Sequence, residues 1–157
     1  MLSKNIFYPI ALLLLLSGTL LNCSKSDEAP CVTSPPTLVF ALLDSTNQSI
    51  ITADNRGSLK ISYTNKVGSK VYLSDVTAVK PTDSQLFYGS SYLIITTARG
   101  ESISSFDLEI SGKVIGTLSV DTYQSSNNCG SWVYASALRF NNTPVSLTDG
   151  IYMIKVN

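Results

Sequence analysis

Hydrophobic and polar residues alternate most clearly between Ser105 and Tyr123. Apolar side chains or glycine occupy every second position of a run within 105–110, and a second run with the same period covers 114–120. A period of two residues is typical of a β-strand with one buried face. The pair Ser111-Gly112 separates the two runs and has the composition of a tight turn. The pattern therefore predicts a β-hairpin with one polar face.

Other segments after residue 36 are rich in β-branched, aromatic or aliphatic residues and are bounded by turn residues. They are expected to form strands at 37–43, 50–51, 59–63, 71–79, 92–97, 131–140 and 151–156. No segment shows the capped 3.6-residue apolar stripe of a surface helix. About eight or nine short strands predict an all-β fold, an antiparallel β-sandwich of immunoglobulin-like or related type. A small β-barrel is the alternative.

The amino-terminal segment has a different composition. Lys4 precedes an apolar run from Ile6 to Leu21, which is shorter than the roughly 20 residues that a membrane-spanning helix needs. A basic start followed by a short apolar run is typical of a secretory signal that is removed from the mature protein. We therefore expect residues 1–22 to be a signal peptide.

The residues that end the apolar run indicate an anchor. Leu20-Leu21-Asn22-Cys23 resembles the lipobox of bacterial lipoproteins, although Asn22 stands where Gly, Ala or Ser is usual. The resemblance implies that the chain is cut before Cys23 and that its thiol receives a diacylglycerol. Two or three acyl chains bind a membrane firmly, whereas one binds only marginally. The alternative is an uncleaved anchor with an incidental cysteine.

Residues 23–36 are expected to be an acylated tether, and residues 37–157 the β-sandwich domain. The tether is polar and contains Lys25 followed by Asp27 and Glu28. This order loosely resembles the acidic signal of surface-exposed lipoproteins of the Bacteroidota, and a solvated linker is an equally good interpretation. The expected location is the outer membrane, with the lipid-anchored domain either in the periplasm or on the cell surface.

The charge balance of the chain and its cysteine content restrict which partners and which covalent bonds are expected. The chain has 11 basic and 11 acidic residues without a block of like charge, which argues against nucleic acid. With Cys23 acylated, Cys31 and Cys129 remain, and two cysteines in an oxidising compartment favour a disulfide. Two free thiols are the alternative. The bond would close a loop of about 100 residues and contribute roughly 4–5 kcal/mol by the chain-entropy argument.

The polar residues favour a non-catalytic protein. The chain has no histidine, so Ser-His and Cys-His arrangements are excluded, and it has no C-x-x-C pair that would suggest a metal site. Asp107 and Glu109 lie on one predicted strand, roughly 6–7 Å apart. Because their neighbours look solvent-facing, both carboxylates are expected to be solvated rather than buried as a catalytic acid would be. We predict no enzyme activity, no metal and no cofactor.

Aromatic residues are the remaining candidates for ligand binding. Phe87, Tyr88 and Tyr92 lie among small residues in an apparent loop, a mixture that binding surfaces often contain, and they are the candidate ligand-binding residues. Trp132 and Tyr134 are expected to be buried, because they share a face with apolar residues later in the same predicted strand.

The mature chain is similar to small lipoproteins of the Bacteroidota, a group without a settled activity. The resemblance rests on the cysteine after the signal, the strand motif LVFALLDS, a dipeptide CG before a late strand and the turn FNNTPV. An anchor without a recognisable catalytic set predicts a membrane-anchored binding or accessory module of the cell envelope. Its expected partners are membrane lipid through Cys23 and either a glycan or an envelope protein. The alternatives are a carbohydrate-active enzyme that uses two carboxylates and a purely structural subunit of an outer-membrane complex.

Overall fold

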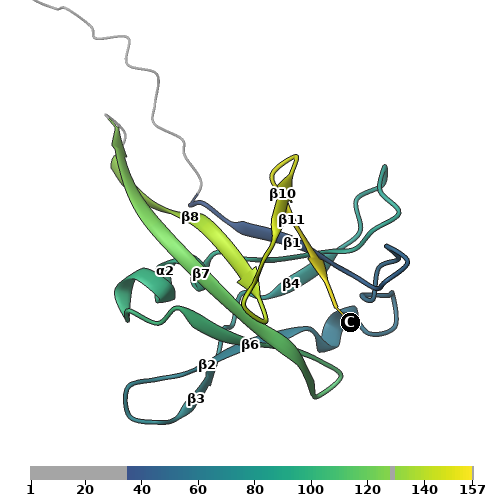
Figure 1. Cartoon of the computed structure of the whole chain (residues 1–157), viewed down its shortest axis with the longest axis horizontal. Coiled ribbons are helices and arrows are strands. Elements are labelled where there is room, and N and C mark those ends of the chain that lie inside the picture. Colours follow the sequence, from purple (N-terminus) through teal and green to yellow (C-terminus); the bar gives the residue numbers. More distant parts are fainter. Residues whose placement is uncertain (1–34, 128–129, 157) are drawn as a thin grey trace, which may run out of the picture. The chain divides into compact units, whose positions relative to one another are not determined.

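The computed structural model describes residues 35–127 and 130–156, which form two β-sheets, one α-helix and one short 3-10 helix, η1 (Arg56–Ser58) (Figure 1). The chain divides after residue 32, and every described residue belongs to the second unit, 33–157. The description of the fold therefore concerns this unit alone.

The first sheet has five strands in the spatial order β10-β11-β1-β5-β4. Their bounds are Ser146–Thr148 (β10), Ile151–Lys155 (β11), Leu38–Leu43 (β1), Tyr88–Ser91 (β5) and Thr77–Val79 (β4). The second sheet has six strands in the order β3-β2-β6-β7-β8-β9. Their bounds are Lys70–Tyr72 (β3), Lys60–Thr64 (β2), Ser105–Ile110 (β6), Lys113–Asn127 (β7), Gly130–Phe140 (β8) and Thr143–Pro144 (β9). Neighbouring strands are antiparallel except β1 and β11, which run parallel.

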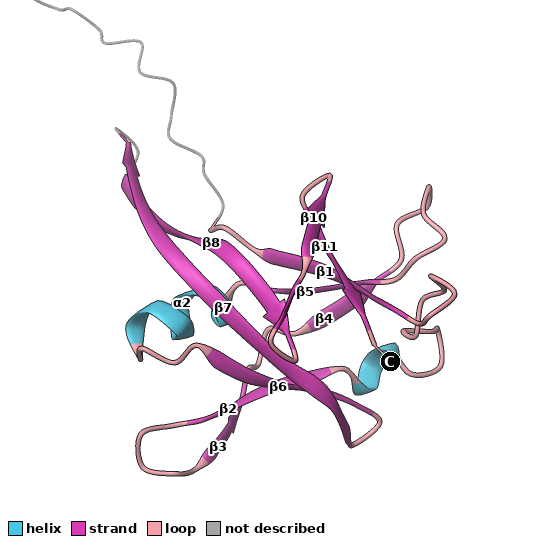
Figure 2. Ribbon diagram, viewed as in Figure 1, coloured by secondary structure: helices cyan, strands magenta, loops and turns pink. Residues whose placement is uncertain are grey.

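The two sheets pack over one hydrophobic core (Figure 2). Side chains from both sheets are buried in it, among them Phe40 of β1 and Phe106 of β6. Each sheet is open and ends in two edge strands, β10 and β4 in the first and β3 and β9 in the second. The predicted all-β sandwich is confirmed, and the alternative of a closed barrel is wrong.

The described part of the chain contains eleven strands, more than the eight or nine expected. The strands that were not expected include β9 and β10, which have two and three residues and lie at sheet edges, and β5, which lies inside the first sheet. The expected strand at 71–79 is also divided into β3 and β4. Strands this short are too brief for an alternating pattern to reveal them.

The predicted hairpin at 105–120 is confirmed, because β6 and β7 pair in antiparallel fashion across their turn. The turn residues Ser111 and Gly112 have φ of 52° and 77°. Two successive positive φ values are characteristic of a type I′ turn, whose twist matches that of the strands it joins. Asp149 and Gly150, with φ of 50° and 79°, connect β10 to β11 in the same way. Local turn residues therefore set the register of both hairpins beside their turns. In the β6–β7 hairpin the register then shifts by one residue between Leu108 and Glu109.

Two expected strands are wrong. Residues 50–51 lie in a loop, beside a single β-bridge between Leu43 and Ser49. Residues 93–97 of the strand expected at 92–97 belong to the α-helix α2 (Leu93–Gly100), which Tyr92 precedes. Their β-branched, apolar composition favoured a strand. Ser91 instead starts a helix, since its Oγ accepts the backbone N–H of Ile94 at 3.2 Å. The helix then buries its apolar side in the core of the sandwich.

A carboxylate from outside the helix completes its amino terminus. Asp75 lies just before β4, and its Oδ2 accepts the backbone N–H groups of Tyr92 at 2.6 Å and Leu93 at 3.0 Å. Its Oδ1 accepts the hydroxyl of Ser91 at 2.8 Å. The negative charge lies at the positive end of the helix dipole. This cap joins residues far apart in sequence, so local pattern could not indicate it.

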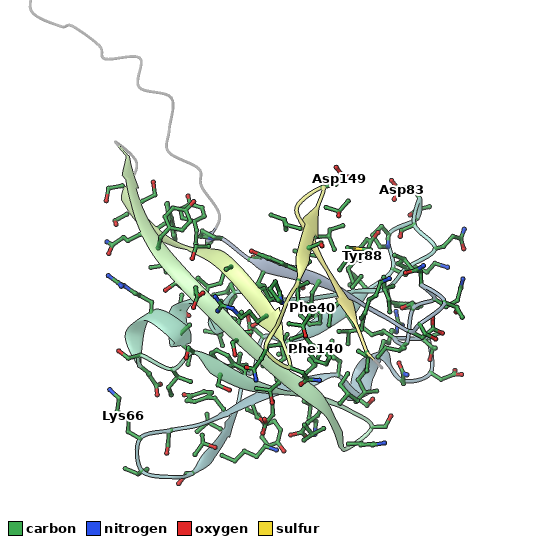
Figure 3. The ribbon with its side chains drawn as sticks, viewed as in Figure 1. Phe40, Lys66, Asp83, Tyr88, Phe140 and Asp149 are labelled. Atoms are coloured by element: carbon green, nitrogen blue, oxygen red, sulfur yellow. The ribbon has the colours of Figure 1, made fainter. Side chains whose placement is uncertain are left out.

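Two glycines leave room for aromatic rings in the interior. Gly89 of β5 pairs directly with Phe40 of β1, and a methyl group at Gly89 would overlap the Phe40 ring. A methyl group at Gly116 of β7 would likewise overlap the ring of Phe140 of β8, although Phe140 pairs with Leu118. Both phenylalanines are labelled in the middle of the sandwich in Figure 3. Each phenylalanine ring packs on the backbone of its glycine, and a larger residue at the glycine position would hold the ring away from that backbone.

Candidate functional site

A shallow groove of about 170 Å³ opens where the ribbon formed by β7 and β8 passes the start of β1 and the β10–β11 hairpin. We call it the tyrosine groove, after Tyr123, Tyr134 and Tyr152, which line it. Leu147 and the beginning of β1 complete its walls, and Ile95 of α2 contributes a further apolar surface. The groove therefore draws on both sheets and on the helix.

Tyr123 and Tyr134 form the most prominent feature of the groove. They are directly opposite each other on β7 and β8, and their rings stack with centroids 5.4 Å apart and planes inclined by 23°. Offset stacking of this kind is a favourable arrangement of two aromatic rings. Although the rings are paired, Tyr123 remains 50% exposed. The pair therefore presents aromatic surface to solvent.

A β-bulge explains why Tyr134 is here and not in the core. Asp121 pairs with Ala137 and Thr122 with Ala135, so Ser136 is an extra residue on β8. The extra residue breaks the two-residue period, and Tyr134 no longer has to share a face with the buried residues later in the strand. The expectation that Tyr134 belongs to the core is therefore wrong: it is half-buried and lines the groove. Trp132, expected to be buried with it, is also only half-buried.

Tyr152 forms the buried side of the groove. Only 8% of its surface is exposed, and burial raises the pKa of its hydroxyl, with a further contribution from the nearby Tyr123. The Tyr152 phenol therefore stays neutral and protonated at physiological pH. A neutral phenol both donates and accepts hydrogen bonds.

The described lining of the tyrosine groove contains no charged side chain. It combines aromatic rings, aliphatic groups, phenol hydroxyls and one threonine. Leu147 is 58% exposed at its rim. The groove is thus suited to a neutral ligand that has both apolar and hydrogen-bonding surface.

The aromatic residues singled out from the sequence lie elsewhere. Phe87 packs half-buried against the core, and Tyr88 belongs to β5, where its hydroxyl shares a hydrogen bond of 2.9 Å with Ser84. Tyr92 is 43% exposed at the start of α2. None of the three lines the tyrosine groove. The pair Tyr123–Tyr134 was harder to identify, because it depends on strand pairing across the β7–β8 ribbon.

The expectation that Glu109 is solvated is wrong. Its exposed fraction is only 5%, although it lies on the outer face of the second sheet. Lys70 of β3 forms an ion pair with its Oε1. Ser62 of β2 donates a hydroxyl hydrogen bond to the same oxygen at 3.3 Å, and the Tyr72 hydroxyl approaches both carboxylate oxygens at 3.4 Å. Side chains from two neighbouring strands therefore cover this carboxylate.

The environment of Glu109 is not that of a catalytic acid. The hydrogen bond from Lys70 lowers the pKa of Glu109 against the opposing effect of burial, and the same contact raises the pKa of Lys70. Both groups are therefore held in their charged forms at neutral pH. A general acid or base instead needs a pKa near the working pH. Asp107, two residues away on the same strand, is only partly buried.

A second hollow, of about 550 Å³, lies where the chain crosses from β9 to β10. Phe140, Val145 and Met153 are among the residues that line it, and Lys155 is the charged residue of its described lining. It is larger than the tyrosine groove but offers one aromatic ring, which is almost completely buried. It therefore lacks the exposed aromatic surface that distinguishes the groove.

Three residues predicted from the sequence to carry covalent chemistry lie outside the described residues: Cys23, Cys31 and Cys129. The predicted signal peptide also lies outside them. Among residues 35–127 and 130–156, no helix is long and apolar enough to cross a membrane. In the same part of the chain, acidic and sulfur side chains form no group of three or more that would suit a metal ion.

Comparisons with known proteins give no independent guide to the role of the tyrosine groove. No protein-family model, no curated protein and no solved structure matches this chain.

Proposed function

We propose that the protein is a lipid-anchored, non-catalytic binding module of the cell envelope, and that the tyrosine groove is its binding site. The carrying observation is the stacked pair Tyr123–Tyr134, of which Tyr123 is half-exposed beside the exposed Leu147. Exposed aromatic and aliphatic surface gathered in one concave place is typical of a recognition site.

The proposed location rests on the sequence. An apolar run ends at Leu20-Leu21-Asn22-Cys23, and a polar segment follows it. Acylation of Cys23 would hold the mature chain at the outer membrane, and the polar segment would give the domain freedom to reach a ligand. The absence of histidine from the chain and the charged state of the Lys70–Glu109 pair support a role in binding rather than in acid–base catalysis.

Footprinting of tyrosines tests whether the groove is occupied in the envelope. Tyr123 and Tyr72 are 50% and 49% exposed, so they form a matched pair inside and outside the groove. Hydroxyl-radical labelling followed by mass spectrometry should modify both in the purified, detergent-solubilised protein. In intact envelopes Tyr123 should be protected and Tyr72 should not. Equal labelling of Tyr123 in the two preparations would contradict a binding role for the groove.

The anchor is tested separately. Cys23→Ala should abolish incorporation of a fatty-acid probe and release at least part of the protein from membranes. Cys31→Ala is the matched control, because it removes a nearby cysteine that the lipobox does not include. Equal labelling of the Cys23→Ala variant and the wild type would overturn the lipoprotein assignment.

A further inference from the structure

We infer that the ligand of the tyrosine groove is a neutral sugar residue, presented singly or within an oligosaccharide. This inference rests on the proposed function, since it assumes that the groove is a binding site. It goes further by assigning the chemical class of the ligand from the charge, surface and size of the groove.

The lack of charged side chains in the described lining of the groove argues against strongly anionic ligands. No described residue that lines the groove is charged, and the pKa of Tyr152 is raised, so this phenol does not supply an anion. A carboxylate or phosphate group placed here would lose water without gaining a partner of opposite charge. Burial of an unpaired charge is costly. A neutral ligand meets no such penalty.

The surface of the groove matches the two kinds of surface on a sugar ring. A pyranose has a face of C–H bonds and a rim of hydroxyl groups. The exposed ring of Tyr123, held in place by its stack with Tyr134, offers a flat face for the C–H surface. The phenol hydroxyls at the groove can donate to and accept from sugar hydroxyls.

Rigidity favours this use of the tyrosine pair. The two residues are directly opposite in the β7–β8 ribbon, so the backbone pairing fixes their spacing before any ligand arrives. Little side-chain freedom remains to be lost when a ligand stacks on Tyr123. Preorganised contacts of this kind increase affinity by reducing the entropy lost on binding.

The size of the groove fits one ring. Its volume is about 170 Å³. Sites for larger drug-like ligands span about 300–1,000 Å³. The groove is open, so neighbouring residues of an oligosaccharide can extend from it into solvent.

A ligand panel tests the assignment. The full chain is purified in detergent and titrated with cellohexaose, mannohexaose and maltohexaose as neutral ligands. An oligogalacturonate is the acidic comparison, and a proline-rich peptide is the comparison for another ligand class that aromatic grooves accommodate. Saturation-transfer NMR and calorimetry should detect binding of at least one neutral oligosaccharide and no binding of the acidic one.

Substitutions test whether the oligosaccharide binds in the tyrosine groove. Tyr123→Ala should weaken the affinity by about tenfold through loss of the stacking face. Tyr123→Phe keeps the ring and should weaken it by only about threefold, the effect of one hydrogen bond. Tyr72→Ala removes an equally exposed tyrosine outside the groove and should leave the affinity unchanged. Circular dichroism confirms that each variant is folded.

The possible failures are distinguishable. If no neutral oligosaccharide binds, or if the peptide binds in the groove instead, the sugar assignment is wrong, while protection of Tyr123 in envelopes would still support the proposed function. If a neutral oligosaccharide binds equally well to folded Tyr123→Ala, its site is not the groove and the inference is wrong. If Tyr123 is not protected in envelopes and no ligand binds, both proposals are wrong.

Discussion

Lys70 and Glu109 form an ion pair across the outer face of the second sheet, from strands that are not neighbours. β2 lies between their strands, and its Ser62 donates a hydrogen bond to the same carboxylate. The ammonium group is partly exposed, with 42% of the Lys70 side chain accessible, whereas only 6% of the Glu109 side chain is accessible. Lys70 thus covers the Glu109 carboxylate, which a strict alternation of buried and exposed faces along the strand would leave in contact with water.

Glu109→Gln should destabilise the domain, with a melting temperature (Tm) lower by several degrees at neutral pH. The substitution removes the charge that pairs with Lys70 and leaves the surrounding donors with a weaker acceptor. Thermal unfolding followed by circular dichroism measures the change. Asp107→Asn is the control, because it neutralises the other carboxylate of the same strand, for which no ion pair is found among the described residues. An equal loss of Tm in both variants would contradict a specific role for the pair.

The effect of Glu109 should depend on pH in a defined direction. Its pKa in the folded protein is lowered from the ordinary value of 4.5, chiefly by the hydrogen bond from Lys70, so the folded state binds the proton less tightly than the unfolded state. The stabilisation is fully present above pH 4.5 and is lost as the pH falls through the folded pKa. The Tm difference between wild type and Glu109→Gln should therefore shrink on acidification from about pH 7 to about pH 3. A difference that stays constant over this range would contradict the pKa shift.

Gly116→Ala should destabilise the domain by about 1–3 kcal/mol, as overpacking of a core does. The new methyl group would overlap the ring of Phe140, and the ring is held in the interior. Chemical denaturation measures the free energy of unfolding. Gly57→Ala is the control, since a methyl group at that position meets no neighbour within 4 Å.

A second substitution tests the cause of that loss. Phe140→Leu should destabilise the domain by itself. When it is combined with Gly116→Ala, the total loss of stability should be smaller than the sum of the two separate losses, because the smaller side chain removes the overlap. Strict additivity would show that Gly116 acts through something other than Phe140.

Asp75→Ala should cost about 1–2 kcal/mol of stability, as loss of a helix cap does. The change removes the acceptor for the backbone N–H groups of Tyr92 and Leu93 and for the hydroxyl of Ser91. Hydrogen exchange should become faster in the first turn of α2 before it changes in the sheets. Asp83→Ala, an exposed residue in the loop before β5, should leave both measurements unchanged. Unchanged exchange at α2 in the Asp75 variant would contradict the cap.

Cys31 and Cys129 should form a disulfide in the exported protein. A reductant should then lower the Tm, since the closed loop of about 100 residues contributes roughly 4–5 kcal/mol in the chain-entropy model. The Cys31→Ala/Cys129→Ala double variant should have a low Tm that no longer responds to reductant. Detection of two alkylatable thiols at these positions by mass spectrometry would show that the pairing is wrong.

The sequence by itself determined the class of the fold and one of its hairpins in detail. The alternating runs on either side of Ser111-Gly112 contain the signals for strand, face and turn within a few residues. Strand pairing across a two-residue turn is a local event, and the positive φ values of these residues realise it directly. The same local pattern was enough to predict a sandwich from many short strands, although the shortest edge strands left no readable period.

Tertiary structure decided what local composition left ambiguous. Residues 92–97 have the composition of a strand, and their helix is completed by Asp75, a residue well before them in the chain. Glu109 was placed on the correct face by its period, but the side chains that cover it come from β2 and β3. The period of a sequence indicates which face of a strand a side chain lies on. It contains no information about which other strands lie beside that side chain in the folded sheet.

The candidate site was the least accessible to sequence reasoning. Phe87, Tyr88 and Tyr92 were selected because they are close together in the chain, whereas the tyrosine groove gathers Tyr123 and Tyr134 through strand register. Ser136, the extra residue of the bulge, turns Tyr134 away from the face that strict alternation assigned to it. Sequence spacing sets local conformation, but the position of a binding surface depends on how distant strands pair, and that pairing is settled only when the two sheets close over their common core.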